Sequence, residues 1–359
     1  MKIKGKLYQS IWEENNAEIF IIDQRFLPHI FVREQLTNLE QACNAIQEMH
    51  VRGAPLIGVT AAYGFYLGLL EDQYELEEIA ESLKATRPTA VDLQWAVDQI
   101  QLQLKNIDHK DERHKIALQQ ARKFREASIK SCYSIGTHGL SLIEKLAAKK
   151  KGPINILTHC NAGWLATVDY GTAIAPIYLA HKKGIELHVW VDETRPRNQG
   201  ARITAFELLE EGVPHTIIPD NTGGHLMQHG KVDMVIVGTD RTTRCGDVGN
   251  KIGTYLKALA AHDNDIPFYV AAPSSSIDWD IRNGVKEIPI EERDPNEVKW
   301  IQGLENGEIK KVLISPLASP ALNFGFDVTP AKYVTGIITE RGIAEANETS
   351  LLNLYPEYK

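Results

Sequence analysis

The sequence predicts an α/β protein in which a mainly helical N-terminal part with short strands precedes a parallel sheet flanked by helices. The chain has 359 residues, more than one hydrophobic core usually organises, so two domains are expected. Apolar residues follow helical spacing before about residue 150, and short β-rich runs alternate with helical segments after it. Such strand-helix-strand alternation indicates parallel pairing.

The N-terminal part contains several segments with apolar residues three and four positions apart. They are NLEQACNAIQEMH (38–50), LIGVTAAYGFYLGLL (56–70), ELEEIAESLKA (75–85) and AVDLQWAVDQIQLQLKN (90–106). The helical pattern continues over 111–150, where Gly136 and Gly139 predict breaks. The first 20 to 30 residues predict one or two short strands. At 15 residues with three glycines, the apolar run 56–70 is too short for the ~20 residues that span a bilayer.

The segment KKKGP at 149–153 separates the two parts, so we expect domains at residues 1–148 and 149–359. The runs INIL, ELHVWV, HTIIP, MVIVG and FYVAA predict strands, and segments such as ARITAFELLEEG and KIGTYLKALAAHD predict helices. Parallel sheets bind ligands outside the carboxyl ends of their strands. The first candidates for chemistry are therefore Cys160, Asp192, Asp220, Asp240 and Pro273.

Composition and missing motifs exclude several classes of function. A net charge of −8 without a block of Lys or Arg argues against an extended surface for nucleic acid or membranes. No GxGxxG follows a strand, and neither a P-loop nor GxSxG occurs, so dinucleotide, NTP and serine-hydrolase functions lack support. His225 and His229 lie four residues apart but lack the Glu of HExxH and a third ligand, so we expect no metal.

The cysteines indicate a reducing environment. Four of them are spread through the chain without CxxC spacing, which suits neither a disulfide scaffold nor a zinc ribbon. They are Cys43, Cys132, Cys160 and Cys245. The first 20 residues carry charges throughout and lack the apolar core of a signal peptide. We therefore expect a cytoplasmic enzyme or regulator.

Two strand ends carry the candidate catalytic groups. Cys160 follows the run INIL in INILTHCNAGWLA, and Asp240 follows the run MVIV in MVIVGTDR. If the two strands are neighbours, a thiol and a carboxyl meet in one crevice, where they suit acid–base chemistry. Spacing alone does not prove that adjacency. In the alternative interpretation, Asp240 caps its loop and Cys160 is a packed, inert thiol.

Other loops offer groups that can bind an anion or a sugar. Asn250 and Lys251 in GDVGNK stand before a helix expected to start near Ile252, where backbone N–H groups and the helix dipole favour a phosphate. The alternative is a helix cap with an exposed lysine. Two arginines, Arg52 before a Gly-Ala pair and Arg87 before a proline, are equally compatible with anion binding and with solvated turns. The segment 191–208 adds Arg195, Arg197 and Gln199, which suit sugar hydroxyls or a solvated loop.

Seven motifs occurring in order resemble one family. They are RGAPLIGV, TRPTAVDLQWA, THCNAG, DETRPRNQGARITAFEL, GTDR, GDVGNKIGTY and IPIEERDP. Together they resemble the S-methyl-5-thioribose-1-phosphate isomerases of methionine salvage, from about residue 5 to residue 345. Wider relatives of that family include ribose-1,5-bisphosphate isomerase and regulatory subunits of translation initiation factor two-B.

The resemblance implies a helical N-terminal domain with a small β-sheet, a Rossmann-like catalytic domain, a homodimer, a phosphorylated sugar substrate and no cofactor. It assigns catalysis to Cys160 and Asp240, and substrate binding to Arg52, Gly53, Ala54, Arg87, Gln199, Asn250 and Lys251. Two departures are Gly249, where the family often has another small residue, and PDNTGGHLMQHG, which occurs in only part of the family. The second departure leaves a different substrate tail open.

The implied substrate carries phosphate on its anomeric oxygen, so its ring cannot reopen to a free aldehyde. We expect Asp240 to protonate the ring oxygen, which requires a buried carboxyl. Hydrogen then moves from C2 to C1 through a phosphoenolate, with Cys160 as base, or by a hydride shift. A base role requires a thiolate, which a helix N-terminus after NAG and nearby arginines favour. Alternatives are 5-deoxyribose-1-phosphate isomerase, ribose-1,5-bisphosphate isomerase and a non-catalytic regulatory subunit.

Overall fold

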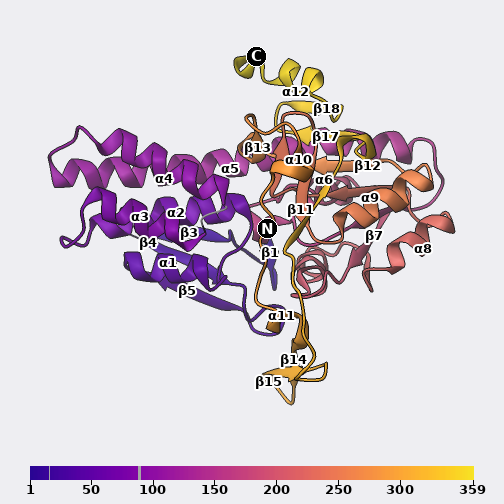
Figure 1. Cartoon of the computed structure of the whole chain (residues 1–359), viewed down its shortest axis with the longest axis horizontal. Helices are drawn as coiled ribbons and strands as arrows, with labels where there is room; N and C mark the ends of the chain where they lie inside the picture. The colour runs from indigo at the N-terminus through magenta and orange to yellow at the C-terminus, as the bar shows by residue number, and fades with distance from the viewer. Residues whose placement is uncertain (16, 88–89) are drawn as a thin grey trace. The chain divides into compact units, whose positions relative to one another are not determined.

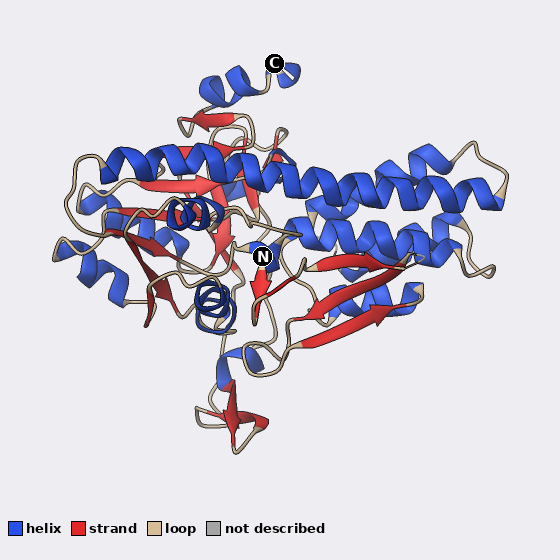
Figure 2. Cartoon of the chain, turned by 180° about the vertical axis from the view of Figure 1, so that it is seen from behind, coloured by secondary structure: helices blue, strands red, loops and turns tan. Residues whose placement is uncertain are grey.

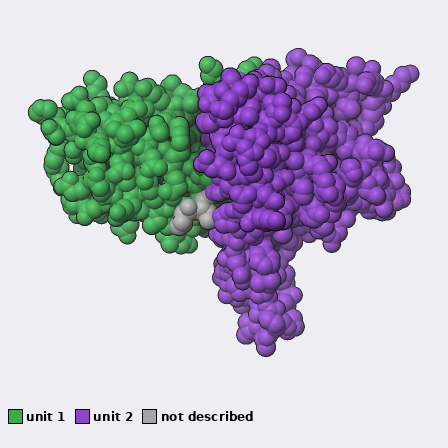
Figure 3. All heavy atoms as spheres, turned by 45° about the horizontal axis from the view of Figure 1, so that its top comes forward, with its two compact units in different colours: residues 1–133, 163–171 green, residues 134–162, 172–359 purple. Residues whose placement is uncertain are grey.

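The computed structural model describes residues 1–15, 17–87 and 90–359, which divide into two units. Unit 1 comprises Met1–Tyr133 and Gly163–Gly171, and unit 2 comprises Ser134–Ala162 and Thr172–Lys359 (Figure 3). The boundary expected from the sequence, at residues 148 and 149, lies at the end of the long helix within which the two units divide. Each unit is described by itself below.

Unit 1 begins with two small antiparallel sheets. The first pairs β1 (Lys2–Ile3) with β2 (Lys6–Leu7), and the second has the order β3 (Ile11–Glu14), β4 (Glu18–Asp23), β5 (Val32–Leu36). In β4, Ile19 and Ile21 are fully buried on one face, as the two-residue period of a strand requires. The described part of this region thus contains five strands, more than the one or two that the sequence predicted.

The helices of unit 1 match the predicted segments. They are α1 (Leu39–Gln47), α2 (Ala54–Leu69), α3 (Leu76–Thr86) and α4 (Val91–Leu104). Every residue of α2 from Leu56 to Leu69 is buried, because a helix that is apolar all round must be covered by its neighbours. Among the described residues, no helix combines the length and the apolar character needed to cross a bilayer.

Helix α5 (Lys110–Ala147) is continuous, so the predicted breaks at Gly136 and Gly139 are wrong (Figure 2). Both glycines instead allow α6 (Ala175–Lys182) to approach closely. A Cβ on Gly136 would lie 2.9 Å from the Cβ of Ala175, and one on Gly139 would lie 2.4 Å from the Cγ of Pro176. Packing therefore explains two glycines that local propensity would place at a helix end.

Unit 2 is built on a seven-stranded sheet with the order β18-β17-β12-β9-β6-β7-β8. Its strands are β6 (Ile154–Thr158), β7 (Leu187–Asp192), β8 (His215–Ile218), β9 (Met234–Val237), β12 (Phe268–Ala271), β17 (Gly336–Thr339) and β18 (Gly342–Ala344). All pairings are parallel except that of β17 with β18. The predicted strands and the predicted α/β fold class with a Rossmann-like sheet are confirmed.

Helices connect and cover these strands. A π-helical turn (Gly200–Thr204) leads into α7 (Ala205–Glu210), and α8 (Thr222–Gln228) and α9 (Thr254–Asp263) follow later in the chain. Apolar residues of α8 and α9 share one buried core with β9 and β12. Since β9 is buried along its whole length, it reads as an unbroken apolar run.

A second, four-stranded sheet of unit 2 has the order β13 (Ile277–Asp278), β10 (Arg241–Thr243), β11 (Val248–Lys251), β16 (Phe326–Thr329). The hairpin of β14 (Trp300–Glu305) and β15 (Glu308–Leu313) extends away from the rest of unit 2 (Figure 1). Short helical pieces complete the chain: Trp164–Ala166 in unit 1, and Ser274–Ser276, α10 (Gly284–Glu287), α11 (Asn296–Lys299), Ala331–Tyr333, α12 (Glu348–Leu354) and Pro356–Tyr358 in unit 2.

Replacing Gly139 by alanine tests whether this glycine is needed for packing. Helix propensity alone favours Gly139→Ala by about 1 kcal/mol. The 2.4 Å approach to Pro176 predicts overpacking, which costs about 1–3 kcal/mol, so we expect lower net stability in urea unfolding. Gly303→Ala is the control, because no atom lies within 4 Å of its added Cβ. A more stable Gly139→Ala protein would contradict the packing explanation.

Candidate active site

The candidate site lies where the strand order of the seven-stranded sheet reverses. From β6 the chain continues to β7 and β8 on one side, and β9 with β12 lies on the other side. Ligands of open α/β sheets bind at such a switch point, outside the carboxyl ends of the strands. Cys160 follows β6 by two residues and Asp240 follows β9 by three. Since β6 and β9 pair directly, the predicted adjacency of the two strands is confirmed.

The loops that carry these two residues touch each other. A Cβ on Gly238, two residues before Asp240, would lie 2.7 Å from the Cβ of Ala162, two residues after Cys160. Only a residue without a side chain allows this approach. The close contact brings the segments that carry the thiol and the carboxyl to one place at the edge of the sheet.

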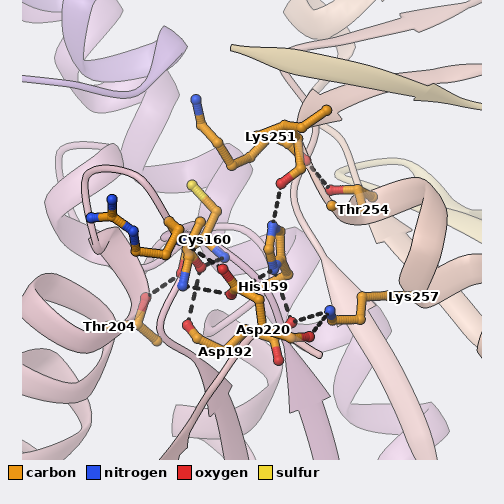
Figure 4. Close-up of polar contacts among 12 residues, drawn as sticks. His159, Cys160, Asp192, Thr204, Asp220, Lys251, Thr254 and Lys257 are labelled. Atoms are coloured by element: carbon orange, nitrogen blue, oxygen red, sulfur yellow. Dashed lines mark hydrogen bonds and ion pairs between the residues drawn. The ribbon is translucent and has the colours of Figure 1, made fainter. Parts of the chain in front are cut away.

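The backbone of Cys160 is held in an unusual conformation. Its φ of 66° is left-handed, and Thr194, to which it is hydrogen-bonded, has a φ of 64°. The Cys160 N–H donates to Thr194 Oγ1 over 2.8 Å, and Thr204 Oγ1 donates to the Cys160 carbonyl over 2.7 Å (Figure 4). Left-handed residues other than glycine are costly and cluster at functional sites. The side chain of Cys160 is buried, and the helix expected after NAG is a short 3₁₀ turn, Trp164–Ala166.

Asp240 lies in a more open environment than the sequence suggested. Its N–H donates to the carbonyl of Gly249 over 3.0 Å, which fixes the start of the β10–β11 hairpin. Its side chain is exposed, whereas the expected acid role called for a buried carboxyl. The desolvation that would keep this carboxyl protonated is therefore absent from the chain without substrate.

Asn250 and Lys251 lie in strand β11, so the helix start predicted near Ile252 is wrong. Helix α9 begins at Thr254 instead. The carboxylate of Asp327 accepts the N–H groups of Gly253 (2.7 Å) and Tyr255 (3.1 Å), and so occupies the position expected for an anion. Burial raises the pKa of the Asp327 carboxyl, and these two N–H groups lower it.

The side chains of Asn250 and Lys251 are both buried. Lys251 Nζ donates to the Gly325 carbonyl over 2.8 Å and lies 4.7 Å from the ring centroid of Phe326. Asn250 Nδ2 donates to Thr254 Oγ1 over 3.0 Å. Figure 4 shows the thiol of Cys160 and the side chain of Lys251 extending away from Asp192 and Lys257. These positions suit an ammonium and an amide that bind a polar ligand beside the thiol.

Gln199 lies in the loop after β7, where the chain folds back sharply. A Cβ on the next residue, Gly200, would lie 1.7 Å from the carbonyl oxygen of Asp192. Gln199 itself is buried, and its Oε1 has no hydrogen-bond partner within the described part of the chain. The two arginines that the sequence grouped with it bind within the protein: Arg195 to the Val298 carbonyl and Arg197 to Glu297.

The remaining predicted substrate-binding residues belong to unit 1. Gly53 precedes α2 with a φ of 93°, and a Cβ there would lie 2.3 Å from the carbonyl oxygen of Ala166. Arg52 precedes Gly53, Ala54 is the first residue of α2, and Arg87 follows α3. Pro88, on which the extended conformation of Arg87 was predicted, lies outside the described residues. Close backbone packing is thus the local reason for the RGA motif.

A charged cluster behind Cys160 was not predicted as a unit. It consists of His159, Asp192, Asp220 and Lys257 (Figure 4). Asp192 and Asp220 were candidates as strand-end residues, but His159 and Lys257 were not. Ligand-type atoms of His159, Asp192 and Asp220 lie within 4.8 Å of one another, and the ammonium of Lys257 contacts both aspartates there. Lys257 thus supplies a cation at the place where a metal would bind. The signal for His159 was its position beside Cys160.

The chain is similar along its length to two kinds of protein. The model of the initiation factor 2 subunit family matches residues 50–346. Methylthioribose-1-phosphate isomerase of Desulfatibacillum aliphaticivorans is 56% identical over 367 aligned residues, which cover 99% of each protein. The crystal structure of 5-methylthioribose 1-phosphate isomerase from Pyrococcus horikoshii OT3 has a TM-score of 0.84 and 39% identity, covering 98% of this chain and 97% of that one. The delta subunit of translation initiation factor eIF-2B from A. fulgidus has a TM-score of 0.80 and 35% identity, covering 98% and 100%.

Replacing Thr204 by valine tests the hold on Cys160. Valine keeps the shape of threonine but removes the hydroxyl that donates to the buried Cys160 carbonyl. Leaving a buried acceptor unsatisfied costs about 1–3 kcal/mol, so urea unfolding should show a loss of that size. In the control, Thr216→Val, water can replace the lost hydroxyl because the residue is exposed, and we expect little change. Equal losses in both variants would show that the Cys160 contact contributes nothing special.

Proposed function

This chain belongs to the initiation factor 2 subunit family, and we propose that it acts there as an aldose–ketose isomerase of methionine salvage. The reaction converts S-methyl-5-thio-α-D-ribose 1-phosphate into S-methyl-5-thio-D-ribulose 1-phosphate. End-to-end identity of 56% with a methylthioribose-1-phosphate isomerase supports it. The observation that carries the proposal is the placement of Cys160 and Asp240 after two paired strands at the switch point of the sheet.

The substrate dictates the chemistry. Phosphate on the anomeric oxygen prevents the ring from opening to a free aldehyde, so the C1–O bond of the ring must break with acid assistance. We assign that acid to Asp240, which donates a proton to the ring oxygen. The same carboxylate can afterwards take the proton from the C2 hydroxyl as the ketone forms, so protons balance over the reaction.

Cys160 serves the transfer of hydrogen from C2 to C1. In the phosphoenolate route its thiolate removes the C2 proton, and the resulting thiol returns a proton to C1. In the hydride route the hydrogen moves with its electron pair directly from C2 to the electron-poor C1, and the thiolate stabilises the positive charge. Both routes require the sulfur to hold a fixed position, which its buried, hydroxyl-bonded backbone provides.

Binding of the sugar phosphate needs donors and cations. We assign the phosphate to Lys251 and Asn250 together with Arg52 and Arg87, and the sugar hydroxyls to Gln199, whose Oε1 has no partner among the described residues. Gly53 and Ala54 complete the set through their backbone. The support for the four unit 1 positions is their match to the RGA and TRP motifs of the family.

Two wider aspects of the proposal rest on the same family. We propose a homodimer, as the resemblance implies. We propose a cytoplasmic location, because a catalytic thiol has to stay reduced, and the four cysteines of the chain are free thiols. A purely regulatory subunit is the rival assignment, and it gives no reason for the chain to carry both Cys160 and Asp240 at one switch point.

Substituting the proposed catalytic groups should abolish turnover with little loss of binding. We expect Cys160→Ser and Asp240→Asn each to lower kcat by at least about 10³-fold, because each removes a group that acts in the transition state. Phosphate affinity, measured by titration with the substrate, should persist. Cys43→Ser is the matched control, since it makes the same atomic change in α1 of unit 1. Near-normal kcat in Cys160→Ser would overturn the assignment.

An isotope experiment separates the two routes. With deuterium at C2 of the substrate, a hydride shift delivers the label to C1, whereas a base that exchanges with solvent loses it to water. The solvated surroundings of the site favour partial exchange for a thiol base, which NMR of the product in H₂O can quantify. Complete retention of deuterium at C1 would exclude a freely exchanging Cys160 and leave the hydride route.

A further inference from the structure

Both ring nitrogens of His159 face hydrogen-bond acceptors. Nδ1 lies 2.9 Å from Asp192 Oδ2, and Nε2 lies 2.8 Å from the backbone carbonyl of Ile252. A carbonyl oxygen can only accept, so Nε2 carries a proton. Asp192 Oδ2 also lies 3.3 Å from the Lys257 ammonium, which favours the ionised carboxylate, so Nδ1 must donate as well. With both nitrogens protonated, the ring is an imidazolium.

The charges around the ring support this protonation state. Three carboxyl groups face it: Asp192 at the end of β7, Asp220 after β8 and Asp327 in β16. The cation among them is Lys257 of α9, which contacts Asp192 and donates to the Asp220 carbonyl. Burial raises the pKa of the Asp192 carboxyl, and the charges of His159 and Lys257 lower it. A charged ring therefore offsets an excess of negative charge in a region from which water is excluded.

The same ring joins two parts of the proposed site. His159 immediately precedes Cys160, and the carbonyl that it binds belongs to the residue after Lys251. The ring fits closely against Gly253, where an added Cβ would lie 3.0 Å from its Cε1 and 3.1 Å from its Nε2. Any shift of the ring therefore moves the thiol relative to the end of β11, which carries Asn250 and Lys251.

We propose that His159 is a positioning residue of the isomerase reaction: as an imidazolium fixed between Asp192 and Ile252, it sets the distance from Cys160 to Asn250 and Lys251. It acts through these residues and does not touch the substrate. The inference rests on the proposed function. Because a misplacement of about 1 Å can cost about 10²-fold in rate, loss of either hydrogen bond should affect turnover more than binding.

Two amide variants of His159 separate the two hydrogen bonds. The amide of His159→Asn can replace the Nδ1 donor toward Asp192, and that of His159→Gln can replace the Nε2 donor toward Ile252. We expect each to lower kcat about 10²-fold while KM changes less than about threefold, since each keeps only one bond. His225→Gln is the control, because this histidine is exposed on α8, and its kcat and KM should stay at the wild-type values. Wild-type kcat in both His159 variants would overturn the proposal.

The pH profile tests the charge on the ring. In Asp192→Asn the ring loses its anionic partner and should release a proton in the range where free imidazole titrates, about pH 6–7. A neutral ring can donate to only one of its two acceptors, so kcat of this variant should fall as pH rises through that range. The wild-type protein and His225→Gln should lack this step. A merely structural role for Asp192 would lower stability and leave the shape of the pH profile unchanged, which would count against the proposal.

A direct measurement covers the case in which the variants fold poorly. In wild-type protein with ¹⁵N-labelled histidine, both nitrogens of His159 should carry protons at pH 7.5, and the signal is assigned by its loss in His159→Gln. A neutral tautomer at that pH would refute the imidazolium. If the wild-type protein fails to isomerise the sugar phosphate, the proposed function fails, while this NMR result still decides the charge state. If it isomerises the sugar and the ring is neutral, only the positioning role fails.

Discussion

The pairing of β6 with a parallel neighbour on each side is the constraint on which the site depends. Its register matches Thr158 with Val191 of β7 and Leu157 with Val235 of β9, so three strands end at one edge of the sheet. The strands are apolar and covered, and the polar residues that follow them have only that edge to occupy. The thiol, the charged cluster and the carboxyl converge there for this single reason.

Convergence alone leaves backbone polar groups without strand partners, and side chains of the same region bind them. Thr194 and Thr204 hold the peptide groups of Cys160, and the Asp220 carboxylate accepts the N–H groups of Thr194 and Arg195. These bonds also stabilise left-handed backbone that would otherwise relax. The site is therefore rigid before any ligand binds, because buried polar groups must be satisfied within the protein.

Sequence patterns predicted what is local and missed what depends on distant partners. The apolar runs located the five parallel strands, and strand ends located Cys160 and Asp240, because a strand announces itself by its own composition. Gly136 and Gly139 misled because their role is set by α6, some 40 residues away. Strand β11 was missed because its partner β16 lies about 75 positions later. His159 stayed unnoticed for the same reason, since its partners come from β7 and from the turn after β11.

The contrast between a buried thiol and an exposed acid indicates how the reaction is timed. Cys160 already has its final surroundings, whereas the Asp240 side chain is open to water. A carboxyl in water gives up its proton near neutral pH, so it becomes an effective acid only when water leaves and a negative charge comes close. A sugar phosphate does both, since it displaces water and carries the negative charge. We therefore expect the substrate to complete the acid, so that protonation of the ring oxygen becomes available only once the sugar is bound.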